Sequence, residues 1–147
     1  MYSAALQEAE SGNRDFAYMQ CRALLENYPD SKYASDAAFA IGEYYFIAAD
    51  YEQAAEAMSN FINEYSDSKG LPFVLMYLLK VSQINKNEPL AEKLKNKIIS
   101  LKRLSFLFQE SKGYAYKSPL RMQYRMIYYI DKVELYVDDK LFEKISY

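Results

Sequence analysis

The chain has 147 residues, of which 51% are hydrophobic and 26% charged, and its formal net charge is −2. This balance excludes a disordered acidic or basic tail and predicts one main domain that folds on its own core. There is no His and a single cysteine, Cys21, so the usual zinc ligand sets and the Ser–His and Cys–His nucleophile pairs cannot be assembled. We therefore expect no enzyme, no metal and no cofactor, with Cys21 as a buried apolar side chain.

Membrane insertion is not expected either. No apolar run approaches the roughly 20 residues of a membrane span, and the first residues, MYSAALQEAE, have neither the basic nor the apolar region of a signal peptide. We expect a soluble protein. The compartment stays open, because this form can also be what is left after removal of a leader or a lipid-carrying cysteine.

An internal repeat occupies the first half of the chain. Gly12 to Ala34 aligns without a gap with Ala49 to Leu71, an offset of 37 residues. The identical pairs are Ala17/Ala54, Tyr28/Tyr65, Asp30/Asp67, Ser31/Ser68 and Lys32/Lys69. A period in this range is typical of stacked helical pairs, each of which cannot bury its apolar face alone.

The apolar residues of this region follow the i, i+3, i+4 spacing of amphipathic helices. They are Ala37, Ala38, Ile41, Tyr44, Tyr45 and Ala48 in one helix and Ala54, Ala57, Met58, Phe61 and Ile62 in the next. Pro29 cannot continue a helix, and Asp30 or Ser31 can cap the following one. The sequence thus predicts helical pairs separated by short turns.

A third pair follows the repeat. Leu71 to Ile84 fits its first helix, with Pro72 at an early helical position. A longer second helix, from about Pro89 to Gln109, carries one apolar stripe. The stripe consists of Leu90, Leu94, Ile98, Leu101, Leu104 and Phe108, with Lys93 and Lys97 at one edge and Lys95 and Lys102 at the other.

The pattern changes near the C-terminus. The segment KVELYVDDKLFEKI, residues 132–145, alternates apolar and polar positions around Asp138-Asp139 and predicts a β-hairpin. Residues 121–130 fit either a helix opened by Ser118-Pro119 or a strand, and we favour the strand. The predicted fold is mainly α: a right-handed solenoid of about three helix pairs over residues 1–110, with a β-hairpin or three-stranded meander over 111–147 packed on the repeats.

Charge is unevenly distributed along the chain. Residues 1–79 hold 12 acidic and 4 basic residues, whereas residues 80–125 hold 3 acidic and 11 basic ones, so an acidic repeat body joins a basic third pair. Lys93, Lys95, Lys97, Lys102 and Arg103 could form a surface for an anionic partner. The alternative, which we favour, is that these side chains only flank the apolar stripe and keep the helix soluble.

Tyrosine is abundant, with 16 residues in the chain. The ones that crowd the end are Tyr114, Tyr116, Tyr124, Tyr128, Tyr129, Tyr136 and Tyr147. They fit an interface, where tyrosine is enriched. They fit better a strand whose alternate residues half-bury against the last helix.

The segment DAAFAIGEYYFIAADYEQAAEAMSNFINEYSDS, residues 36–68, resembles the tetratricopeptide repeat family, in the branch of the BamD-type outer-membrane assembly lipoproteins and the Tol-Pal-associated periplasmic coordinator. The resemblance covers roughly Ala4 to Val81. It implies that partner peptides lie along a concave face lined by the first helix of each pair. The matching side chains are Phe39, Glu43, Tyr44, Tyr45 and Tyr77.

The sequence therefore predicts an adaptor or scaffold that binds a protein or peptide, and no nucleic acid. The resemblance implies the cell envelope, in the periplasm or on the periplasmic face of the outer membrane, with peripheral membrane association through a removed lipid anchor. A cytoplasmic repeat adaptor and a self-assembling module, in which the basic pair of one copy meets the acidic body of another, are the alternatives.

Overall fold

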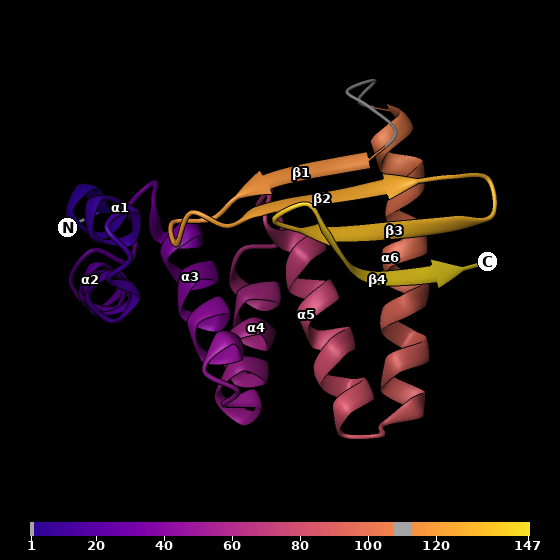
Figure 1. Ribbon diagram of the computed structural model, residues 1–147, viewed down its shortest axis with the longest axis horizontal. Coiled ribbons are helices and arrows are strands. Elements are labelled where there is room, and N and C mark those ends of the chain that lie inside the picture. The colour runs from indigo at the N-terminus through magenta and orange to yellow at the C-terminus, as the bar shows by residue number, and fades with distance from the viewer. Residues whose placement is uncertain (1, 108–112) are drawn as a thin grey trace.

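The computed structural model describes residues 2–107 and 113–147, with side chains for 2–102 and 113–147. Within these residues six helices precede four strands (Figure 1). The helices are α1 (Tyr2–Glu10), α2 (Arg14–Asn27), α3 (Ala34–Ile47), α4 (Tyr51–Glu64), α5 (Leu71–Ile84) and α6 (Glu88–Leu107). The strands are β1 (Gly113–Lys117), β2 (Gln123–Tyr128), β3 (Lys132–Val137) and β4 (Lys140–Ser146). The predicted stack of helix pairs with C-terminal strands is confirmed.

The turn inside each helix pair has the same construction at the period found in the sequence. A residue with positive φ is followed by a side chain that caps the second helix of the pair. The positive-φ residues are Gly12, Ala49 and Lys86, with φ of 89°, 61° and 56°. The caps are Asn13, Asp50 and Asn87, which accept from the backbone N–H groups of Phe16, Gln53 and Leu90. Thus the predicted third pair follows the same repeat.

The final helix differs slightly from its predicted range, since α6 begins at Glu88 rather than Pro89. Its predicted end at Gln109, and the proposed domain boundary between residues 110 and 111, lie outside the described residues. Cys21 is buried, as expected, among small residues of α1, α2 and α3. Burial raises the pKa of its thiol to about 12, so the reactive thiolate is suppressed.

The four strands form one antiparallel sheet in the order β1-β2-β3-β4. The hairpin predicted around Asp138-Asp139 is present, and both turn residues have positive φ, as a two-residue type I′ turn requires. The favoured strand within residues 121–130 is β2. Strand β1 was not anticipated. It starts at Gly113, where a Cβ would lie 1.7 Å from the carbonyl oxygen of Met126, so only glycine fits this close approach.

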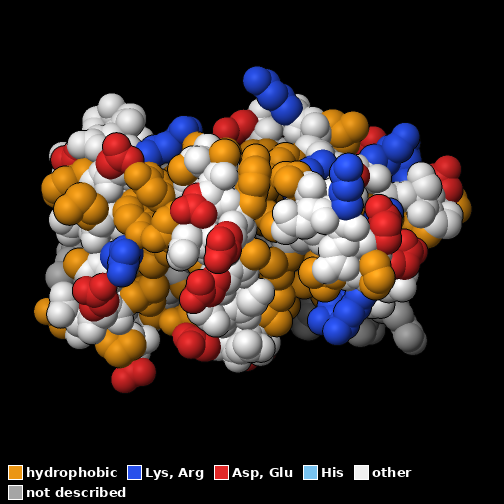
Figure 2. Space-filling view, turned by 90° about the horizontal axis from the view of Figure 1, so that it is seen from below, with side chains coloured by type: hydrophobic (Ala, Val, Ile, Leu, Met, Phe, Trp, Pro, Cys, Tyr) orange, Lys and Arg blue, Asp and Glu red, His pale blue; other side chains and the backbone are white. Residues whose placement is uncertain are grey.

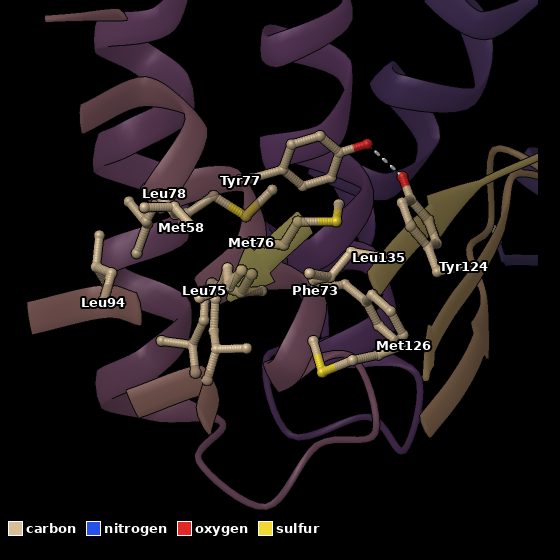
Figure 3. Packing of buried hydrophobic residues seen from close by; sticks show 14 of the residues in the cluster. Met58, Phe73, Leu75, Met76, Tyr77, Leu78, Leu94, Tyr124, Met126 and Leu135 are labelled. Atoms are coloured by element: carbon tan, nitrogen blue, oxygen red, sulfur yellow. Dashed lines mark hydrogen bonds between the residues drawn. The ribbon is translucent and has the colours of Figure 1, made fainter. Parts of the chain in front are cut away.

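The sheet lies against α3, α5 and α6, crosses α6 between its ends and shares their core (Figure 1). Tyr124, Met126 and Tyr128 alternate along β2 and are all buried. Figure 3 shows Tyr124 and Met126, with Leu135 of β3, packed beside Phe73 and Tyr77 of α5. Helices α3 to α6 and the sheet therefore bury one continuous set of apolar side chains, and neither side of that core is complete alone.

Shortening an inward side chain of the sheet should test this dependence. Leu135 of β3 is 0% exposed, whereas Leu141 of β4 is 54% exposed. We expect Leu135→Ala to lower the free energy of unfolding by about 2–5 kcal/mol and Leu141→Ala by less than about 0.5 kcal/mol. Urea titration followed by the far-ultraviolet helix signal measures both values. Equal effects of the two variants would show that the helices fold independently of the sheet.

Candidate partner-binding surface

The first helices of the second and third pairs carry all five residues implied by the family resemblance, and three of these are buried. Phe39 and Glu43 of α3 are both 0% exposed, and Tyr77 of α5 is 2% exposed. The rings of Tyr116 and Tyr124 cover Phe39, with centroids 4.8 Å and 5.4 Å from it. This differs from the expected open face, because the chain's own sheet occupies it. These three side chains are out of reach of a partner in this conformation.

Glu43 is a carboxyl group enclosed in the core between α3 and the sheet. Its Oε2 accepts a hydrogen bond from the hydroxyl of Tyr124, which is in turn 2.6 Å from the hydroxyl of Tyr77 (Figure 3 shows this second contact). Burial raises the pKa of Glu43 to about 8, although the hydroxyls of Tyr124 and Ser118 and the charge of Arg14 act in the opposite direction. Glu43 is thus neutral at pH 7, and a neutral acid suits an apolar interface.

A raised pKa makes stability depend on pH. Folded Glu43 keeps its proton up to about pH 8, whereas in the unfolded chain the group loses it near its ordinary value of 4.5. Unfolding therefore releases a proton between these values, and stability falls as pH rises by about 1.4 kcal/mol for each pH unit. We expect Glu43→Gln to remove this component, measured by urea unfolding from pH 5 to 9.

The exposed Glu52 of α4 supplies the control. Glu52→Gln should follow the wild-type pH profile, since this substitution leaves the buried Glu43 in place. Parallel profiles for wild type and Glu43→Gln would contradict a proton held by Glu43.

The other two residues implied by the resemblance stay at the surface. Tyr44 and Tyr45 of α3 are half-buried and contact Tyr18 of α2. The Tyr18 and Tyr44 rings stack with centroids 4.2 Å apart, and the hydroxyls of Tyr18 and Tyr45 are 2.5 Å apart. We call these three residues the tyrosine cluster. From below, hydrophobic side chains form a strip between the α1–α2 pair and α3 (Figure 2).

Polar contacts fix the tyrosine cluster in place. The hydroxyl of Tyr44 donates to Asp15, which together with partial burial raises the pKa of Tyr44 to about 12. Arg22 donates to the hydroxyl of Tyr18 over 3.1 Å. Ordered aromatic side chains lose little further conformational freedom when a partner binds. Sequence reasoning missed Tyr18 and Asp15, because their role depends on the packing of α2 against α3.

Four of the five side chains of the predicted basic surface are described, and they differ in exposure and in contacts. Lys93 and Lys97 are exposed on one face of α6. Lys95 is half-buried. Lys102 donates to the carbonyl of Tyr129 over 3.0 Å and lies over the ring of Tyr147, so it ties α6 to the sheet. The side chain of Arg103 lies outside the described residues. Among the described side chains of this set, Lys93 and Lys97, one helical turn apart, line the same groove.

The tyrosines of the sheet mostly serve its attachment to the helices. Tyr114 and Tyr128 donate to the carbonyls of Leu101 and Ile98 in α6 over 2.8 Å and 2.6 Å. Tyr116 donates to Asp36 of α3 over 2.7 Å. The period-two spacing of these residues was the signal in the sequence, and it pointed to burial on the helices.

Comparison with known proteins shows the family to which the chain belongs. The model of the YfiO family, described as outer membrane lipoprotein, matches residues 1–133 of the chain, and the chain therefore belongs to this family. The match runs from α1 to the beginning of β3. Among curated proteins, none matches the chain significantly. In the described part of the chain, no helix is long and apolar enough to cross a membrane, and no group of three or more potential ligands could hold a metal ion.

Proposed function

We propose that this chain is a non-catalytic adaptor or scaffold of the bacterial cell envelope, acting at the periplasmic face of the outer membrane in its assembly or maintenance. The observation that carries the proposal is membership of an outer membrane lipoprotein family over residues 1–133, a range that includes α1 to α6. Stacked helical pairs support it physically, because they offer an extended surface to another polypeptide.

The tyrosine cluster is the surface that we propose for this partner. Tyr44 and Tyr45 are the members of the expected site that a partner can still reach, and their hydroxyls are held by Asp15 and Tyr18. Tyrosine is enriched at protein interfaces because it combines a large apolar ring with a polar tip. A partner that buries this cluster would gain apolar area at a small entropic cost.

Replacing both rings tests the site. The double variant Tyr44→Ala/Tyr45→Ala should capture at least about tenfold less partner from an envelope fraction than the wild-type chain, because interface tyrosines of this kind cost more than about 1.4 kcal/mol when truncated. Capture on immobilised protein, quantified by mass spectrometry, gives the ratio for each captured protein.

Two further variants make the test specific. Tyr44→Phe/Tyr45→Phe keeps both rings and should retain most of the binding. Tyr129→Ala/Tyr147→Ala removes two tyrosines that are more exposed than Tyr44 and Tyr45, at 41% and 43%, beside the ends of β2 and β4, and should leave capture unchanged. Circular dichroism confirms the helical content of each variant. Unchanged capture by the double alanine variant at positions 44 and 45 would remove the cluster from the proposal.

A further inference from the structure

A groove runs between α4 and α6 beside the beginning of α5, and the sheet contributes none of its lining residues. Its volume is about 450 Å³, within the range of sites that hold ligand groups in proteins. We call it the α4–α6 groove. Its apolar residues are Ile62, Leu71, Leu75 and Leu101, and its basic residues are Lys93 and Lys97.

The two lysines are unpaired in the part of the chain that the structure describes. Among the described residues, Lys93 and Lys97 take part in no ion pair and no hydrogen bond, and both are exposed. By contrast, Lys80 of α5 pairs with Glu143 of β4 over 3.0 Å. The described acidic residues of the repeat body, residues 1–79, therefore form no ion pair with these two lysines. No carboxylate lines the groove. Two like charges one turn apart even repel each other slightly.

The equivalent groove one repeat earlier carries a charge of the opposite sign. A groove of about 290 Å³, the α2–α4 groove, contains Leu25, Ile41, Phe61 and Glu64. Its lining includes this carboxylate and no basic residue. The same architecture thus provides two apolar grooves that differ in the sign of their charge. A segment with acidic side chains would be attracted to one groove and repelled by the other.

We propose that the α4–α6 groove binds an acidic amphipathic helix of a partner protein, whose carboxylates pair with Lys93 and Lys97. The two lysines are spaced i, i+4 on a helix, and glutamates with the same spacing on a second helix present matching charges. Apolar residues on the same face of that helix enter the groove, as in other complexes where a helix lies in a hydrophobic groove. The proposal rests on the adaptor function but uses a surface separate from the tyrosine cluster.

A synthetic peptide tests the proposal with the full chain. The probe is a fluorescent amphipathic helical peptide with leucines at i, i+3, i+4 and i+7 flanked by glutamates, and its counterpart carries lysine in place of every glutamate. Fluorescence anisotropy at low and moderate salt should show binding of the acidic peptide and at least about tenfold weaker binding of the basic one.

Charge reversal in the chain locates the contact. Lys93→Glu/Lys97→Glu should weaken the acidic peptide about tenfold and strengthen the basic one, since two exposed attractions become repulsions. Lys140→Glu/Lys144→Glu makes the same change in net charge at exposed positions of β4 and should leave both peptides unaffected. Methyl resonances of Ile62 should shift on binding while those of Ile41, in the α2–α4 groove, stay in place.

Three results would overturn the proposal. One is absence of binding by the acidic peptide. Another is equal weakening by the two charge-reversal variants, which would indicate a general effect of net charge. The third is binding to vesicles of anionic phospholipid, lost in Lys93→Glu/Lys97→Glu, without binding of the peptide, which would assign the lysines to a membrane surface. Envelope capture through the tyrosine cluster is measured separately, so the adaptor function can survive any of these results.

Discussion

Tyr124 lies where the sheet meets the helices. Its ring packs edge-on against Phe39, with 5.4 Å between centroids, and its hydroxyl contacts both Tyr77 and the carboxyl group of Glu43. Each of these polar atoms would destabilise the core without a partner. The two hydroxyls and Oε2 of Glu43 satisfy one another across α3, α5 and β2, so the contact fixes the orientation of the sheet as well as its adhesion. Among the described residues, Oε1 of Glu43 has no hydrogen-bond partner.

This contact determines which surfaces remain for other molecules. A stack of helical pairs leaves an apolar face on its first helices, and a short stack buries too little of it to be stable. Here Met126, Tyr128 and Leu135 of the sheet complete that burial. The last helix is tied down as well, because Tyr114 and Tyr128 donate to its carbonyl groups. The sheet therefore covers the apolar face that the stack of helices would otherwise expose.

Local features of the fold were readable from the sequence, whereas long-range ones were not. The offset of 37 residues predicted the helix pairs, and it recurs in the capping residues Asn13, Asp50 and Asn87. The strand at residues 123–128 and the Asp138-Asp139 turn were likewise visible in side-chain alternation and turn chemistry.

The position of the sheet on the helices could not be predicted from the sequence in this way. Glu43 reads as an exposed carboxylate of an amphipathic helix, and only the approach of Tyr124, 81 residues later, encloses it. The same limit applies to Tyr18, whose partners Tyr44 and Tyr45 lie on the next helix. Contacts between distant segments depend on the assembled tertiary structure, which periodicity along one element does not encode.

Since the sheet fills the face of α3 and α5, the surfaces that we propose for partners lie on the remaining sides of the helices. The tyrosine cluster offers aromatic area and hydroxyl groups, while the grooves beside α4 offer apolar floors with opposite charge. Apolar area alone distinguishes poorly between partners, whereas a mismatched charge at the rim is penalised. The uneven charge of the chain, which nearly cancels in total, thus becomes a local difference between two otherwise similar grooves.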